Sequence, residues 1–297
     1  MSTIQTGGPQ SLIDQGAKHW LFVEGNDNSC FDPDVLRTLL KENDLPALNV
    51  SALGSCENVR LAAQAMVYQH KSYYFVIDRD GRSDDFVEKS WQRFPDPDTY
   101  NLLVWRKREL ENYFIDPIYI LQSQYLVKSE DELRSKLLKM AQKRLFLDVA
   151  NLVLLELREA LIRPPEAWFR NPDEFPDRSA ALARLQGCQE LTDKYSATTT
   201  LLVPSYRNER FDFWLQRLTG GKPLLEYGEG EWLLMMSGKE LFSNIINEAF
   251  KVLDTEGNAL TGLKKNTAIA RKLLSLPLNR QPRDFQDLVA LMKLRAT

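Results

Sequence analysis

The first third of the chain alternates short apolar runs with amphipathic stretches. Apolar runs at 19–23, 73–77 and 102–105 and the alternating segment LNVSAL at 48–53 predict four strands. Between them, apolar residues recur at helical spacing, for example at 59–67. Strand–helix alternation of this kind favours a parallel sheet with helices on both faces. We therefore predict an α/β fold with a doubly wound sheet of order 2-1-3-4.

From residue 126 onward the pattern is mostly helical, and proline-rich joints separate the segments. It predicts a flexible lead-in at 1–16, an α/β domain at 17–125 and a mainly α-helical domain at 126–297. The most apolar stretch, at 145–162, contains Asp, Glu and Arg residues and is too charged for a bilayer span. We expect it to be a buried helix that follows a separate amphipathic helix at 130–144, and we expect no association with a membrane.

Charge and cysteine content narrow the possible partners and compartments. The net charge is -3, so a nucleic acid would have to be held by a local basic patch. Three widely spaced cysteines form no C-x-x-C pair, which excludes a disulfide framework and a thiolate zinc site. The N-terminus lacks the plan of an export signal. A reducing cytoplasm fits these features.

Acidic residues follow two of the predicted strands. The first strand continues into Glu24 and, three residues later, Asp27, and the third continues into Asp78 and Asp80. In the order 2-1-3-4 these strands are neighbours, and ligands bind beyond their carboxyl ends. Clustered carboxylates repel one another unless a cation lies between them. The sequence therefore predicts a shared metal site, although an acidic turn after a strand is often only a solvated loop.

The residue types of this site indicate the metal and the reaction. Neither histidine nor cysteine stands beside these acids in the sequence, so the ligands are hard oxygens that suit Mg²⁺ or Mn²⁺. Open oxygen sites of this kind serve phosphoryl and phosphodiester chemistry. The segment DRDGRSDD is not an EF-hand, because its glycine is at the fourth position of the loop.

A third acidic element, WRKRELENYFIDP, follows the fourth strand. Its Glu109 and Glu111 are candidate metal ligands or general bases. Candidate nucleic-acid-binding residues lie beside these glutamates and in the next predicted helix. They are Arg106, Lys107, Arg108, Lys136, Lys139 and Lys143. The alternative is that both groups are solvated and paired with acids of the chain itself.

Three segments together resemble a known catalytic domain. LFVEGNDN, YYFVIDRDG and RELENYFIDP, in this order, resemble the Toprim domain shared by topoisomerases, bacterial primases and OLD-family nucleases. RELENY and the later WLLMMSGKELF look like stand-alone Toprim proteins that are encoded beside ABC-type ATPases in anti-phage defence of the PARIS type. The resemblance covers the first 125 residues and reaches the helical half only through the GKEL segment.

The resemblance implies roles for individual residues. It makes Glu24 an acid/base or metal-binding residue, Asp78 and Asp80 a metal-binding pair, Asp27 an accessory acid, and Glu109 with Glu111 the acids of a second metal. Asn26 and Asn28 depart from the lysine, serine or threonine that relatives often have there, so this turn lacks the residues that would contact a phosphate.

The resemblance also implies a biological setting. It describes a toxic Mg²⁺-dependent endonuclease that is held inactive by an ABC-type ATPase and active as a homodimer, with RNA, such as tRNA, slightly preferred over DNA. The chain has no P-loop motif, so ATP would be used by the partner. Two alternatives remain open: a non-catalytic sensor or scaffold subunit of the ATPase complex, and a D-x-D that binds the diphosphate of a nucleotide sugar.

Overall fold

The computed structural model describes residues 19–25, 31–45, 48–96, 98–160, 169–189, 191 and 203–296. The predicted lead-in at 1–16 and the candidate acid Asp27 lie outside the described residues.

Four strands form one parallel sheet, as the sequence predicts. They are β1 (His19–Val23), β2 (Leu48–Ala52), β3 (Tyr73–Ile77) and β4 (Leu102–Val104), in the order β2-β1-β3-β4. Strand β1 pairs with β2 on one side and with β3 on the other, where Trp20 is opposite Tyr73. All five residues of β3 are buried, which is why this strand reads as a continuous apolar run.

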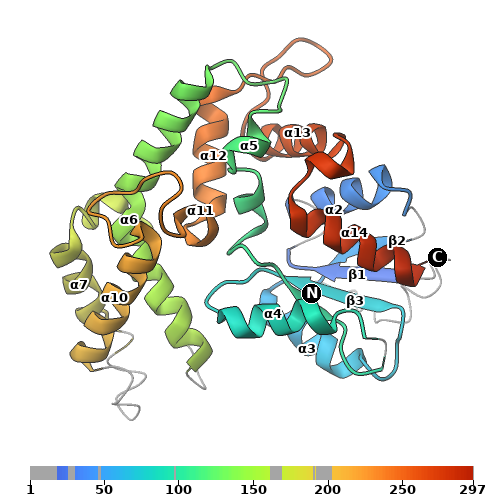
Figure 1. The fold of residues 1–297 in the computed structure, drawn as a ribbon, viewed down its shortest axis with the longest axis horizontal. Helices are drawn as coiled ribbons and strands as arrows, with labels where there is room; N and C mark the ends of the chain where they lie inside the picture. The colour runs from blue at the N-terminus through green and yellow to red at the C-terminus, as the bar shows by residue number, and fades with distance from the viewer. Residues whose placement is uncertain are drawn as a thin grey trace, which may run out of the picture. The chain divides into compact units, whose positions relative to one another are not determined.

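Helices cover both faces of the sheet. Helix α2 (Phe31–Glu42) and helix α14 (Arg283–Ala296) lie on one face, whereas α3 (Cys56–Met66) lies on the other (Figure 1). Right-handed crossovers place α2 and α3 on opposite faces, because the chain moves outward from β1 to β2 and then back across to β3. The apolar face of α2 is fully buried through Val35, Leu36, Leu39 and Leu40.

The chain divides into two compact units whose sequence ranges alternate. The first comprises 1–77, 90–104 and 274–297, and the second comprises 78–89 and 105–273. Helix α4 (Asp84–Arg93) crosses this division. The boundary at residue 126 stays a prediction. The units are defined by contacts in space and not by order in the sequence. The acidic loop after β3 therefore belongs to the second unit, and the last helix belongs to the first.

The second unit is built around helix α6 (Glu130–Ala160), for which the sequence indicated two helices. No glycine or proline interrupts residues 130–160, so a single helix of 31 residues forms. The other elements are η1 (Leu110–Tyr113), α5 (Pro117–Ile120), η2 (Pro172–Glu174), α7 (Arg178–Gln186), α10 (Pro204–Thr219), α11 (Trp232–Met235), α12 (Gly238–Ala249) and α13 (Gly262–Leu274). The short η3 (Leu278–Arg280) precedes α14. None of the described helices is both long enough and apolar enough to span a bilayer.

Candidate functional site

Glu24 follows the last residue of β1, at a turn that glycines shape. The backbones of Gly25 and Gly54 exchange two hydrogen bonds of 2.7 and 2.8 Å. Both glycines have positive φ, 113° and 86°, which side-chain-bearing residues rarely adopt. This bridge fixes the direction in which the chain leaves the strand, and it holds Glu24 beside the start of α3.

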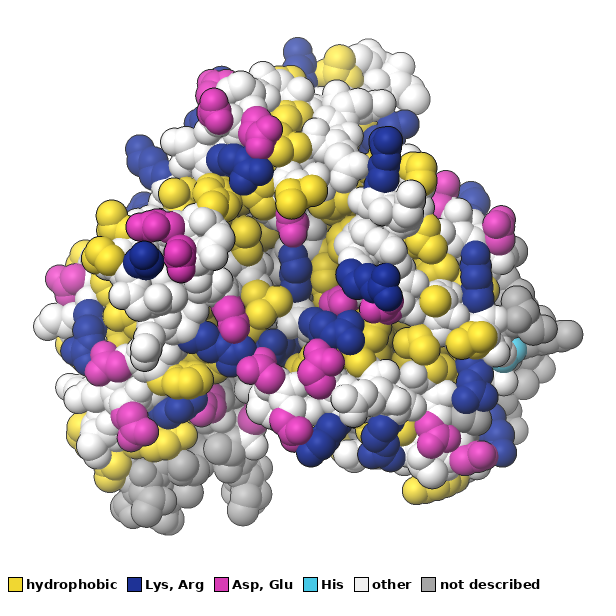
Figure 2. All heavy atoms as spheres, viewed as in Figure 1, with side chains coloured by type: hydrophobic (Ala, Val, Ile, Leu, Met, Phe, Trp, Pro, Cys, Tyr) yellow, Lys and Arg dark blue, Asp and Glu magenta, His cyan; other side chains and the backbone are white. Residues whose placement is uncertain are grey.

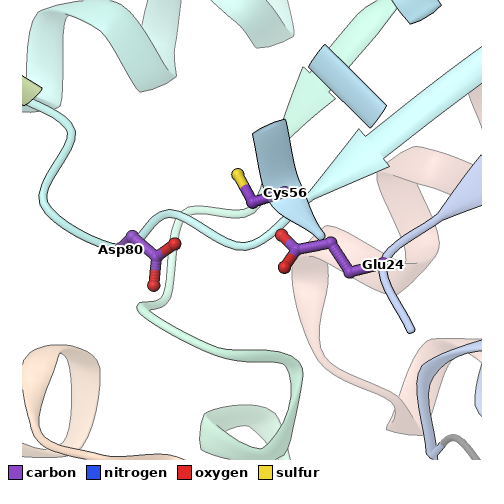
Figure 3. Close-up of side chains that lie close together, drawn as sticks. All are labelled: Glu24, Cys56 and Asp80. Carbon is purple, nitrogen blue, oxygen red and sulfur yellow. The ribbon is translucent and has the colours of Figure 1, made fainter. Parts of the chain in front are cut away.

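Cys56, the first residue of α3, lies close to Glu24. Its Sγ is within 4.8 Å of a carboxylate oxygen of Glu24, and Figure 3 shows both side chains. The expectation that only hard oxygen ligands surround these acids is therefore wrong for Glu24, because a thiol lies close to it. Cys56 is 32 positions further along the chain, and only the folded sheet brings it near. Figure 3 also labels Asp80, which belongs to the second unit.

Asp78 begins the D-x-D loop, residues 78–81, in the second unit. Its side chain is only 2% exposed. Oδ1 accepts a hydrogen bond from the backbone N–H of Leu110 at 3.1 Å, and Oδ2 accepts one from Nζ of Lys239 at 3.1 Å. Asp80 is half-buried and has φ of 50°, in the left-handed region. Within this unit, a guanidinium nitrogen of Arg82 lies 3.9 Å from its carboxylate.

Backbone hydrogen bonds join the D-x-D loop to the segment that contains the two glutamates. We call residues 106–113 the glutamate segment. The carbonyl of Arg108 accepts the N–H groups of Arg79 and Asp80, at 3.0 and 3.3 Å. Together with the bond from Leu110 to Asp78, these contacts hold the two acidic segments side by side.

Glu109 is buried against the N-terminus of α12. Its Oε2 accepts the backbone N–H of Lys239 at 2.8 Å and the hydroxyl of Ser237 at 3.3 Å. A carboxylate is favourable there, because the first N–H groups of a helix lack partners within it and carry partial positive charge. The same contacts would suit a purely structural cap. Glu111 is also buried, on η1.

Asn112 connects the glutamate segment to the GKEL segment. Its side-chain amide donates to the carbonyls of Leu233 and Met236, at 3.0 and 2.9 Å, and its Oδ1 accepts the N–H of Glu109 at 3.0 Å. Gly238 is pressed against it, since a Cβ there would lie 2.4 Å from Oδ1 of Asn112. The two segments RELENY and SGKEL, far apart in the sequence, therefore pack directly together.

Arg108 lies inside the second unit, although the sequence suggested a phosphate contact. Its side chain is 1% exposed, and its guanidinium is 3.7 Å from Glu109 and 3.9 Å from Asp148 of α6. Arg144 also pairs with Asp148, at 3.2 Å. The guanidinium of Arg108 is therefore buried near two carboxylates and is not available to a phosphate at the surface.

The other basic residues of the glutamate segment contact the chain itself. Arg106 pairs with Glu88 at 2.9 Å. Nζ of Lys107 donates to the carbonyl of Asn112 at 3.0 Å. These contacts agree with the alternative that the basic residues of this segment are paired within the chain itself.

The candidate basic stripe on α6 is partly paired in the same way. Lys136 lies 2.7 Å from Glu248, and Lys143 lies 3.3 Å from Asp173, whereas Lys139 is exposed. On the face drawn in Figure 2, Lys and Arg side chains are interspersed with Asp and Glu side chains. A role of this stripe in binding nucleic acid stays a prediction.

The candidate ligands of the second unit are carboxylates, the residue type that a hard divalent cation takes. Asp78 and Glu109 offer carboxylate oxygens, and Lys239 contacts both residues.

Comparisons of this chain with known protein families, with curated proteins and with solved structures found no match.

Sequence reasoning missed three of the residues that organise this site. The sequence shows Lys239 only as part of the GKEL segment, indicates no role for Ser237, and shows Asp148 only as a charge within an apolar helix. Asp148 did carry a signal, because an acid in the middle of a buried helix requires a partner.

Proposed function

We propose that this chain is a metal-dependent nuclease whose α/β part is a Toprim-type catalytic domain. The proposal is supported most by one observation. The neighbouring parallel strands β1 and β3 are each followed directly by an acidic residue, Glu24 after Val23 and Asp78 after Ile77. These strand ends lie at the point where the sheet order reverses, which is where open α/β sheets bind their ligands.

The proposed roles follow from the residue types. Asp78 and Asp80 hold Mg²⁺ or Mn²⁺, with Glu109 and Glu111 as further acids. When bound, the cation stabilises negative charge on the phosphate oxygens and lowers the pKa of bound water. Glu24 accepts or holds a proton at its carboxylate, and the buried Arg108 orients Glu109. Cys56 beside Glu24 is not needed for this chemistry.

We propose the biological setting on the resemblance alone. The nuclease is a cytoplasmic effector that cuts RNA in preference to DNA and acts as a homodimer. An ABC-type ATPase holds it inactive until infection is sensed. The sequence supports a separate ATPase because it has no P-loop of its own.

The proposal is tested with the purified chain, free of any partner. Labelled RNA, tRNA and duplex DNA are incubated with it in EDTA, Mg²⁺ or Mn²⁺, and products are separated on denaturing gels. We expect cutting only with a divalent cation, and its loss in Glu24→Gln and Asp78→Asn. Cutting that survives both substitutions contradicts the site.

A scaffold subunit is the second candidate function, and the contacts of the acids favour it in one respect. Glu109 caps α12 and Asp78 pairs with Lys239, so both acids have roles in the fold without a metal. If no nucleic acid is cut under any condition, but an ABC-type ATPase is found encoded beside the chain and binds it, the scaffold function is correct.

A further inference from the structure

Lys239 contacts two candidate metal ligands with two different groups. Its Nζ lies 3.1 Å from Oδ2 of Asp78, and its backbone N–H donates to Oε2 of Glu109 at 2.8 Å. All three residues belong to the second unit. One residue therefore spans the D-x-D loop and the glutamate segment.

The two partners of the Lys239–Asp78 ion pair differ strongly in burial. The side chain of Asp78 is 2% exposed, whereas that of Lys239 is 51% exposed. A carboxylate that is removed from water is costly unless a positive charge or several hydrogen bonds compensate. Asp78 therefore requires a countercharge in place. The lysine side chain can return to water at little cost, because its stem is flexible and its ammonium is strongly hydrated.

The backbone of Lys239 is held against the glutamate segment by two contacts. Gly238 before it is packed against Asn112, so closely that a Cβ would lie 2.6 Å from the backbone N of Asn112. Its own N–H is bound by Glu109. These contacts anchor the start of α12, so the ammonium can leave Asp78 by rotation of the lysine side chain alone.

We propose that Lys239 is the resident countercation of Asp78. Its ammonium holds the carboxylate oxygen that a divalent cation needs, so the cation binds only by displacing it. Lys239 thereby limits the affinity of the site for metal and keeps the buried acid compensated when metal is scarce. This inference rests on the proposed metal site at Asp78.

The test measures the binding of Mn²⁺ itself, by isothermal titration calorimetry and by electron paramagnetic resonance of the unbound ion. Wild type is compared with Lys239→Met and with the polar variant Lys239→Gln. Removing a positive charge a few ångströms from the ion should tighten Mn²⁺ binding about fivefold or more. The metal-free variants should also melt at a lower temperature than wild type and gain more from added Mn²⁺.

Two control variants separate local from general effects. Lys222→Met removes one charge from a lysine that lies 3.9 Å from Glu229, and it should leave Mn²⁺ affinity unchanged. Asp78→Asn should abolish the binding. Circular dichroism identifies any Lys239 variant that does not fold, and the other variant is then used.

The outcomes distinguish this inference from the proposed function. If wild type binds Mn²⁺ through Asp78 but both Lys239 variants bind it equally or more weakly, the inference is wrong and the metal site remains. If neither wild type nor the Lys239 variants bind Mn²⁺, the proposed metal-dependent function fails as well.

Discussion

The guanidinium of Arg108 lies 3.9 Å from the carboxylate of Asp148, and both side chains are almost completely inaccessible to solvent. Arg108 also donates to the carbonyl of Met235 at 3.3 Å, and its own carbonyl accepts the N–H groups of the D-x-D loop. This ion pair therefore fixes Arg108, which belongs to the glutamate segment and contacts both the D-x-D loop and the segment that contains Met235.

Asp148→Asn should destabilise the protein strongly, because it leaves the buried guanidinium of Arg108 without full countercharge. Removing one partner of a buried ion pair costs about 3–5 kcal/mol, and we expect the free energy of unfolding to fall by an amount in that range. Urea titration followed by circular dichroism measures it.

A surface ion pair provides the matched control. Asp173→Asn breaks the exposed pair with Lys143, and it should cost less than about 1 kcal/mol. The double variant Arg108→Met with Asp148→Leu, which removes both charges, should recover part of the loss. If Asp148→Asn costs no more than Asp173→Asn, the buried pair does not stabilise this unit.

Asp78→Asn should abolish metal-dependent cutting while it preserves the local structure. Asparagine keeps the Oδ1 acceptor for the N–H of Leu110 but lacks the charge that holds a cation. We expect the rate of RNA cutting to fall at least about a hundredfold, as when a group that stabilises transition-state charge is removed. Initial rates on denaturing gels measure this.

The control for that variant is Asp98→Asn, which removes the same charge from an exposed pair with Lys71. It should cut at the wild-type rate. Equal rates for Asp78→Asn and wild type would show that Asp78 does not hold the catalytic ion.

The strands were predictable from the sequence because buried strands produce short apolar or alternating runs of residues. The run at Tyr73–Ile77 is apolar throughout, and β3 has these bounds. The acids at 24 and 78 were placed at strand ends for the same reason. The sequence predicts α6 in two pieces because its change from amphipathic to apolar composition resembles a boundary, but no glycine or proline lies within residues 130–160 and one helix forms.

The partners of the acids were not predictable, since nothing local indicates which distant segments meet. Lys239 is separated from Asp78 by 161 positions, and its contact depends on how α12 packs against η1. Arg108 illustrates the same limit. Three consecutive basic residues, 106–108, indicate an exposed surface. Arg108 is nevertheless buried, and the acid that it faces, Asp148, is on the distant helix α6.

Gly81→Ala should disturb the D-x-D loop, because this glycine touches the backbone of α6. A Cβ at this position would lie 2.7 Å from the carbonyl carbon of Leu155 and 2.9 Å from the backbone N of Glu156. A helix backbone yields little, so we expect a loss of about 1–3 kcal/mol in the free energy of unfolding, measured by urea titration.

Gly187→Ala is the control for that substitution. Gly187 is exposed after α7, and the nearest atom to its Cβ would be a carbonyl oxygen at 3.2 Å. Its cost should stay within about 0.5 kcal/mol. If the two alanine variants are equally stable, the loop is not held against α6 as the structure indicates.

Asp84 should make part of the stability depend on pH in the acid range. Burial acts to raise the pKa of this carboxyl, but hydrogen bonds from Arg217 and Arg79 outweigh it and lower the pKa below the ordinary value of 3.8. The unfolded chain therefore takes up a proton more readily, and the contribution of Asp84 is present above pH 3.8 and lost as the pH falls through the lower folded-state pKa. The difference in melting temperature between wild type and Asp84→Asn should be constant near neutral pH. It should shrink toward zero as the pH falls through that acid range. Asp85→Asn, which removes an exposed pair with Lys89, should differ little from wild type throughout. A difference for Asp84→Asn that persists at the lowest pH would show that the carboxylate charge is not what stabilises this contact.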